Sequence, residues 1–365
     1  MIIGIDAGAI CEADERLKVG LYRVTFELLR HLSKIDTEHF YRLYSYSPIP
    51  RSVLEHLGNT MVNISLAPSV GYMKVRLPLH LAFHPVDVFL GLSQAVPSGA
   101  HHAIGFIYDL GFLQAPGEYG AAADRLKQQT EETINRSTHI VTISKASKRD
   151  IIRTYHVDER RISVVLPGVS DVFLQPGEEK HCTHPYILSV GLLKPGKHIP
   201  LAIQAFSRFL KKTKIPYDFV IIGGEKKADP EIRKTINGLH LEKRVRLLGY
   251  IPDEDVAKWY RGAEGLIALS THEGFCLPAA EALSCGCSVI YINQGALPEI
   301  VGPGGIAVQQ NTASDISEAI DELSQKTKRT TLGKLAMEQS KKYRWDTFAS
   351  SVLFLINRVL KENTK

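Results

Sequence analysis

The sequence predicts an α/β protein with two doubly wound parallel sheets. Short apolar runs alternate with longer amphipathic stretches along almost the whole chain, the pattern of parallel strands joined by helices. The alternation stops between residues 166 and 184, which are rich in Pro, Gly and charge, and then restarts. At 365 residues the chain is also too long for one ordinary core. We therefore expect domains at 1–168 and 185–343, followed by a terminal helix within 344–365.

In the first domain, an apolar run over residues 2–5 predicts the first strand, and a glycine-containing loop then leads to an amphipathic helix over 20–32. Further strands are expected over 41–46, 86–90, 103–108 and 140–144. Helices are expected over 121–135 and after Ser144, whose hydroxyl can accept a hydrogen bond from a free backbone N–H at the helix start.

In the second domain, the pattern predicts strands over 186–190, 218–222, 245–248, 265–269 and 288–291, with helices between them. A last helix over 346–360 places five apolar residues on one face: Phe348, Val352, Leu355, Ile356 and Val359. Two wound sheets that face each other would form a cleft between their carboxyl-end loops, which is the default ligand site of such folds.

Composition narrows the function classes. Hydrophobic residues make up 44% and charged residues 23%, typical of a globular protein. The net charge of +5 permits an anionic ligand or membrane surface, but aromatic and basic residues do not interleave as in single-strand binders, so we expect no nucleic acid. Five unpaired cysteines indicate reduced thiols and a cytoplasmic protein. No apolar run approaches the roughly 20 residues that span a bilayer, and the first residues lack signal-peptide features, so any membrane contact would be peripheral.

Residues 270–290 carry the most informative motif. A strand ends near Ser270, a loop carries Glu273 and Gly274, and Pro278 opens a helix with Glu281 in its first turn. Gly274 lets backbone approach a ligand, free N–H groups at the helix start suit phosphate or hydroxyl oxygens, and the two carboxylates suit vicinal sugar hydroxyls. Alternatively, Glu281 only complements the helix dipole and Glu273 is a solvated loop residue. The combination favours a binding site.

Three further loops follow strands of the second domain. Lys197, at a helix start, could neutralise a diphosphate, or it is a surface lysine on a turn. A strand over 219–222 ends on Gly223 and Gly224, and backbone over 249–251 could hold a nucleobase edge.

Together with Leu297-Pro298-Glu299, this motif resembles the donor site of retaining glycosyltransferase family 4, the E-x7-E motif of the GT-B fold, in which two Rossmann-like domains face each other. The similarity covers nearly the whole chain, including segments 4–7, 19–22, 107–110 and 141–148. It implies an N-terminal acceptor domain, a C-terminal donor domain and a terminal helix that returns to the first domain.

The resemblance also implies a role for each matching residue. Glu281 would bind donor ribose, Glu273 the transferred sugar, and Lys197 the leaving diphosphate. Backbone at Gly274, Phe275, Cys276 and Leu277 would hold sugar hydroxyls or phosphate oxygens, and Gly249, Tyr250 and Ile251 would border the base. Tyr108 would lie near the reacting carbon, and Gly20 and Asp109 on the acceptor side. No metal or other cofactor is expected, because lysine and helix-end amides stabilise the charge.

The sequence departs from the family pattern at two site positions. Tyr108 replaces a histidine that contacts the donor sugar, and Gly196 replaces an arginine beside the phosphate lysine. Cys276 for glycine and Ser288 for proline are interpreted as packing changes. Asp253-Glu254-Asp255 matches a metal-binding D-x-D pattern, but it follows Pro252 and is better explained as a helix N-cap with acidic residues in the first turn.

The resulting hypothesis is a retaining glycosyltransferase that moves a hexose, with mannose from GDP-mannose as first guess, to a glycan or polyprenyl-diphosphate-linked acceptor in cell-surface polysaccharide biosynthesis. Alternatives are a catalytically weak GT-B subunit that binds a partner glycosyltransferase, and a sugar-nucleotide epimerase. Residues 71–83 mix apolar and basic side chains and could rest on anionic lipid, or could form a helix packed on its own sheet.

Overall fold

The computed structural model describes residues 1–365 except 13, 15–17, 19, 59, 225–229 and 363–365. The chain divides into two units, Met1–Gly168 together with Arg344–Lys365, and Val169–Tyr343. The first unit is therefore built from two separate stretches of sequence. Residues 169–184, which the sequence analysis treats as a linker, belong to the second unit.

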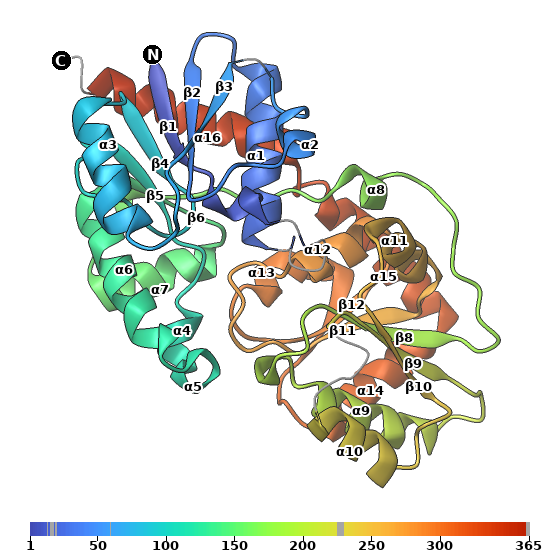
Figure 1. Ribbon diagram of the computed structural model, residues 1–365. Coiled ribbons are helices and arrows are strands. Elements are labelled where there is room, and N and C mark those ends of the chain that lie inside the picture. Colours follow the sequence, from blue (N-terminus) through green and yellow to red (C-terminus); the bar gives the residue numbers. More distant parts are fainter. Residues whose placement is uncertain (13, 15–17, 19, 59, 225–229, 363–365) are drawn as a thin grey trace. The chain divides into compact units, whose positions relative to one another are not determined.

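The sheet of the first unit has seven parallel strands in the part of the chain that the structure describes, in the order β3-β2-β1-β4-β5-β6-β7 (Figure 1). The winding reverses between β1 and β4, whose carboxyl ends therefore lie side by side where ligands commonly bind in such sheets. The strands are β1 (Ile2–Asp6), β2 (Phe40–Ser45), β3 (Met61–Ser65), β4 (Val88–Gly91), β5 (Ala103–Phe106), β6 (Ser137–Thr142) and β7 (Ile162–Val164).

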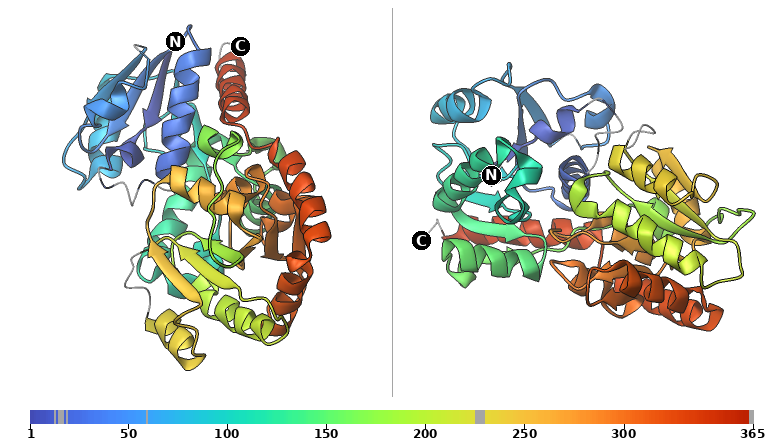
Figure 2. Two further views of the ribbon diagram at one scale, coloured as in Figure 1. Left: turned by 90° about the vertical axis from the view of Figure 1, so that its right-hand side faces the viewer. Right: turned by 90° about the horizontal axis from the view of Figure 1, so that it is seen from below.

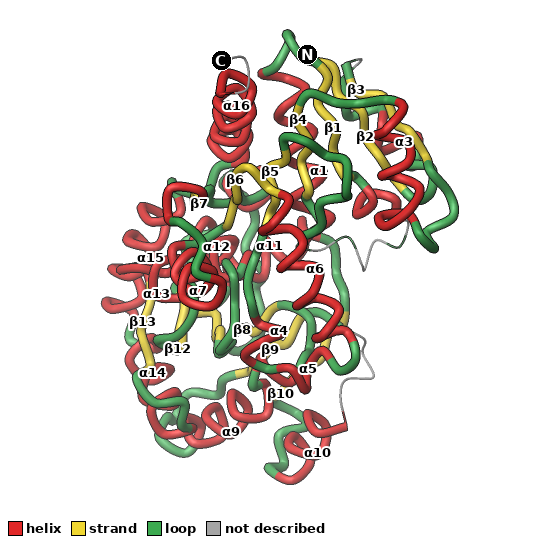
Figure 3. Tube along the Cα trace, turned by 90° about the vertical axis from the view of Figure 1, so that its left-hand side faces the viewer, coloured by secondary structure: helices red, strands yellow, loops and turns green. Residues whose placement is uncertain are grey.

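Helices cover both faces of this sheet, and Figure 3 shows the face that carries α3 and α6. On one face α16 lies beside α1, and its apolar stripe packs into the same core as strand residues such as Ile5 and Leu90 (Figures 1 and 2). On the other face lie α3, α6 and α7. The helices of this unit are α1 (Leu21–Ile35), α2 (Arg51–Leu54), α3 (Leu77–Phe83), α4 (Gly111–Gln114), α5 (Pro116–Tyr119), α6 (Ala122–Arg136), α7 (Lys145–Tyr155) and α16 (Trp345–Glu362).

The second unit repeats this architecture with six parallel strands among its described residues, in the order β10-β9-β8-β11-β12-β13. Here the winding reverses between β8 and β11. The strands are β8 (Tyr186–Val190), β9 (Asp218–Ile222), β10 (Val245–Gly249), β11 (Gly265–Ala268), β12 (Val289–Ile292) and β13 (Gly305–Val308).

One face of the second sheet packs against α9, α10 and α14 around a core that contains Phe206 and Phe219. The opposite face carries α12, which packs against α11 and α15. The helices of this unit are α8 (Asp171–Leu174), α9 (Ile199–Leu210), α10 (Pro230–Gly238), α11 (Asp253–Gly262), α12 (Leu277–Ser284), α13 (Leu297–Val301), α14 (Ala313–Ser324) and α15 (Lys326–Ser340).

The predicted elements are present, with ends shifted by a few residues. Ser144 caps α7 as expected, accepting a hydrogen bond from the backbone N–H of Ser147 at 3.0 Å. Asp253 and Asp255 lie in the first turn of α11, as expected, but neither is the N-cap: that position is Pro252, which has no side-chain acceptor. Three strands at the sheet edges, β3, β7 and β13, were not predicted.

Candidate functional site

The loop after β8 is shaped by two glycines. Gly191 and Gly223 both have positive φ angles, of 134° and 115°. A Cβ atom on Gly223 would lie 2.2 Å from the carbonyl oxygen of Gly191, so only glycine allows the two backbones to approach this closely. The Gly191 N–H also donates to the carbonyl of Ile222 at 3.0 Å. These contacts fix the loop that leads to Lys197.

Lys197 and Glu273 form an ion pair in which the lysine ammonium donates to the Glu273 carboxylate. Their side chains are only 23% and 21% exposed. Burial disfavours the ammonium, but the Glu273 carboxylate outweighs it and raises the pKa of Lys197. Lys197 is therefore fully charged near neutral pH.

The loop that carries Glu273 is held by the segment after β12. The Ala296 N–H donates to the Glu273 carbonyl at 3.3 Å. Gly295, with a φ of 60°, lies against the same backbone. Gly274 and Phe275 are buried, and the Phe275 ring meets Tyr343 edge-on at a centroid distance of 5.3 Å. These contacts fix the loop that carries the Glu273 carboxylate.

Cys276 lies immediately before α12 in a left-handed conformation, with φ 72° and ψ 72°. This conformation is unusual for a residue with a side chain, and such strain is concentrated at functional sites. Its side chain does not cap the helix. Burial, followed by the nearby Glu273 carboxylate, raises the pKa of the Cys276 thiol to about 12, so it stays protonated at neutral pH.

Glu281 is buried on α12 and accepts a hydrogen bond from the Tyr260 hydroxyl at 3.4 Å. The prediction that it lies in the first turn was wrong. The helix begins at Leu277, with Pro278 as its second residue, and no acidic residue lies in the first turn. Glu281 therefore occupies the second turn, where a carboxylate interacts only weakly with the helix dipole.

The predicted base-side residues are the last residue of β10, Gly249, and the two residues that follow it. Gly249 has a φ of 71°, and its carbonyl accepts a hydrogen bond from the Gly223 N–H at 2.8 Å. Tyr250 is 42% exposed and Ile251 is half-buried. Gly249 is thus joined through Gly223 to the loop that precedes Lys197.

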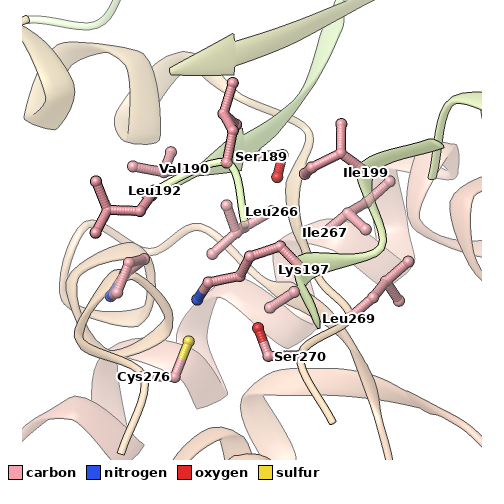
Figure 4. A pocket seen from close by; sticks show the side chains of 14 residues that line it. Ser189, Val190, Leu192, Lys197, Ile199, Leu266, Ile267, Leu269, Ser270 and Cys276 are labelled. Atoms are coloured by element: carbon pink, nitrogen blue, oxygen red, sulfur yellow. The ribbon is translucent and has the colours of Figure 1, made fainter. Parts of the chain in front are cut away.

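A small pocket lies at the carboxyl ends of β8 and β11, the strands between which the winding reverses (Figure 4). Gly191, Lys197, Cys276 and Pro278 line it, together with Ser270, which the sequence analysis did not identify as a site residue. Figure 4 shows the Ser270 hydroxyl and the Cys276 thiol on the side of the pocket where Lys197 extends.

Ser270 is 4% exposed, and its hydroxyl has no hydrogen-bond partner among the described residues. A buried unpaired hydroxyl costs about 1–3 kcal/mol, and this one lines the pocket, where it is placed to bond an entering polar atom. The sequence offered one signal for it, the end of a strand directly before the Glu273 loop.

The other predicted residues belong to the first unit. The Tyr108 hydroxyl donates to the Leu92 carbonyl at 2.8 Å, and burial strongly raises the pKa of this phenol. Asp109 accepts from the Gly111 N–H at 2.9 Å at the start of α4. Gly20 precedes α1, is exposed and has a φ of 50°. Val19, in the same predicted glycine loop, lies outside the described residues.

Asp6 is a second residue that the sequence analysis did not single out as a site residue. It ends β1, is buried, and accepts hydrogen bonds from the Ser93 hydroxyl and, at 3.4 Å, the Tyr72 hydroxyl. Burial raises the pKa of its carboxyl despite these bonds. Asp6 thus lies at the carboxyl end of β1, next to the point where the winding of the first sheet reverses.

Among the described residues, no three His, Cys, Asp or Glu side chains lie close enough together to hold a metal ion. Of the predicted site residues, the structure brings Lys197, Glu273 and Cys276 together in the second unit and places Tyr108 and Asp109 in the first.

Residues 173–339 match the family model of the glycosyl transferases group 1. The matched stretch contains Lys197, Glu273 and Glu281. This domain belongs to the group 1 glycosyltransferases. The glycosyltransferase domain spans nearly all of the second unit, including both loops of the ion pair.

Comparison with known proteins extends the similarity beyond this glycosyltransferase domain. The chain is 25% identical to O-antigen chain mannosyltransferase B of Escherichia coli over 278 residues, which cover 73% of each protein. It spans about half the length of further curated relatives, between 43% and 59%.

Solved structures identify the fold as GT-B. HepE of Anabaena, solved in complex with UDP and glucose, superimposes with a TM-score of 0.73 at 16% identity, covering 98% of this chain and 99% of that one. WaaG, a glycosyltransferase involved in lipopolysaccharide biosynthesis, superimposes with a TM-score of 0.74 at 13% identity, covering 96% and 98%. At these identities the likeness is one of fold.

Proposed function

We propose that the chain is a retaining, metal-independent glycosyltransferase that takes a sugar from a nucleotide-sugar donor held in the second unit. The observation that carries this proposal is the Lys197–Glu273 pair beside the start of α12, with Glu281 on the same helix. One ammonium, two carboxylates and a helix start offer partners for a diphosphate, a sugar and a ribose.

In this proposal each group has one task. Lys197 binds the donor diphosphate and stabilises the negative charge that develops as the bond between the anomeric carbon and the phosphate oxygen breaks. Glu273, released from the lysine, accepts hydrogen bonds from the transferred sugar, and Glu281 accepts them from the ribose. The acceptor oxygen forms the new bond on the same face, and its proton passes to the leaving phosphate oxygen.

The first test is a thermal-shift screen of the purified protein with UDP, GDP, ADP, dTDP and CMP, each with and without EDTA. A ligand at a hundred times its Kd stabilises a protein by about 2.7 kcal/mol, well within detection. We expect one nucleotide to raise the Tm independently of EDTA. Lys197→Ala abolishes the shift, whereas Lys194→Ala, an exposed lysine of the same loop, preserves it. No shift with any nucleotide, or a shift that needs a metal, contradicts the proposal.

For the transferred sugar we propose mannose, with GDP-mannose as donor, and a glycan or polyprenyl-diphosphate-linked acceptor of a cell-surface polysaccharide. The support is the similarity to two O-antigen chain mannosyltransferases, each 25–26% identical to this chain. Donor hydrolysis followed for GDP-mannose, UDP-glucose and ADP-glucose tests the donor. The anomeric configuration of the product, read by NMR, tests retention: a β-linked sugar from an α-linked donor refutes it.

A second candidate is a catalytically weak subunit that binds a partner glycosyltransferase. It is favoured by Tyr108, whose hydroxyl donates a hydrogen bond to the Leu92 carbonyl. Burial raises the pKa of this phenol, so it stays protonated near neutral pH and does not act as a base. Tyr108→His distinguishes the two. A large gain in turnover supports the weak subunit, whereas a loss supports an enzyme adapted to tyrosine.

A further inference from the structure

Residues 72–83 form one helical segment with two contrasting faces. The segment opens with a π-helical turn, Tyr72–Arg76, and continues directly as α3, Leu77–Phe83. Tyr72, Leu77 and Leu81 are buried in a core with strand residues such as Tyr44. This face packs on the sheet of its own unit, one of the two alternatives that the sequence left open.

The other face carries an apolar stripe that the described part of the chain leaves exposed. Val75, Leu79 and Phe83 are 61%, 59% and 75% exposed. Their spacing of four residues places them one above the other on the helix. A single exposed apolar side chain is ordinary, but three large ones in line on one short helix form a patch.

The surroundings of this stripe are basic. From His56 to Val86 the sequence contains no Asp or Glu, although the chain has 39 such residues. Lys74 is exposed beside Val75. At the other end, the Arg42 guanidinium donates to the carbonyls of His84 and Pro85, both at 3.1 Å, and places positive charge at the carboxyl end of α3. The stripe therefore has a cationic side chain at each end; the first acidic residue beyond it, Asp87, accepts a hydrogen bond from the Ile2 N–H at 2.6 Å.

We propose that this face of the segment 72–83 docks on the surface of an anionic lipid bilayer. Val75, Leu79 and Phe83 enter the interface, while Lys74 and Arg42 meet lipid phosphates. Eight residues of helix rise by only about 12 Å, which is short for the roughly 800 Å² per partner of a stable protein interface. A bilayer needs no shaped counterpart. No helix in the described residues could span a membrane, and this mode of attachment requires none.

The experiment is vesicle flotation of the full chain, with vesicles of phosphatidylcholine alone and of phosphatidylcholine mixed with phosphatidylglycerol. We expect binding only to the mixed vesicles, weakened by salt. Leu79→Ser with Phe83→Ser should lower the partition coefficient at least about tenfold, since both replacements remove buried apolar area. Lys74→Gln should lower it by about fivefold, since one basic residue near an anionic surface contributes on the order of 1 kcal/mol.

The matched control is Ile215→Ser with Phe354→Ser, which removes exposed apolar side chains of comparable size elsewhere. It should float like the wild type, and circular dichroism should show that both double variants are folded. Equal flotation of wild type and Leu79/Phe83 variant overturns the proposal. So does a concentration-dependent dimer that this variant abolishes, because the occupant is then a second copy of the chain. Nucleotide binding is read separately and should be unchanged in all these variants, so this proposal and the proposed function fail independently.

Discussion

The ammonium of Lys197 donates a hydrogen bond to the carboxylate of Glu273, which lies 76 residues further along the chain. In the absence of a ligand the two groups therefore neutralise each other. A diphosphate must compete with Glu273 for the lysine, and a sugar must compete with Lys197 for the carboxylate. Donor binding is thus an exchange of partners within the site.

This exchange predicts opposite effects on binding and transfer in Glu273→Gln. Free nucleoside diphosphate should bind about fivefold more tightly, because a partly exposed ion pair contributes on the order of 1 kcal/mol. Sugar transfer should fall by about a hundredfold, since the variant lacks the charged acceptor for sugar hydroxyls. Calorimetric titration and a donor-turnover assay measure the two. Weaker diphosphate binding would show that Glu273 does not compete for Lys197.

Ser270→Ala should weaken nucleotide-sugar affinity by about tenfold while leaving the free energy of unfolding unchanged or slightly raised. The substitution removes a buried hydroxyl that has no partner within the described chain. The folded protein therefore loses no internal hydrogen bond, and only a bond to the ligand is lost. Ser288→Ala is the control, since the Ser288 hydroxyl is also buried and unpaired but does not line the pocket. Equal affinities of the two variants would remove Ser270 from the site.

Gly223→Ala should destabilise the second unit by about 3 kcal/mol, since it combines backbone strain with a clash. The added Cβ would lie 2.2 Å from the Gly191 carbonyl oxygen at a φ of 115°. Gly238→Ala, where no described atom outside the neighbouring helix backbone lies within 4 Å of the added atom, should be neutral or stabilising. Urea unfolding measures both. An unchanged Gly223 variant would mean that the loop before Lys197 relaxes without cost.

His139 makes the first unit sensitive to acid. Burial, and then the Arg358 guanidinium, lower the pKa of this imidazole from 6.5 to about 4. Above pH 6.5 it is neutral in both states; between pH 6.5 and 4 only the unfolded chain binds the proton. The free energy of unfolding should therefore fall by about 3 kcal/mol over this range and no further below it. His139→Gln should lack this component in urea titrations at each pH, and an unaltered pH profile would refute it.

Sequence reasoning succeeded where the signal is local. The apolar stripe of α16, the strands of both sheet centres and the Ser144 cap all follow from periodicity or from the chemistry of one side chain. It failed at β3, β7 and β13, because edge strands are short and half-exposed: β7 has only three residues, and β3 leaves Val62 in solvent.

Within the candidate site, motif spacing predicts individual residues but not their mutual contacts. The Lys197–Glu273 bond joins positions 76 residues apart, which no local pattern encodes. The turn of Glu281 was misplaced because Cys276 adopts a left-handed conformation and the helix begins one residue earlier than Pro278 suggests. The Ser270 hydroxyl lacks a hydrogen-bond partner in the described chain because of how the pocket is packed, which no local sequence pattern encodes.

The return of α16 to the first unit also affects how the protein is made. Residues 345–362 supply one side of the hydrophobic core that the first 168 residues begin, whereas the second unit is one uninterrupted stretch. On the ribosome, the second unit can complete its fold while the first still exposes the apolar surface that α16 will cover. The first unit is thus the first to begin synthesis and the last to complete its fold, and in that interval its uncovered apolar surface is open to aggregation.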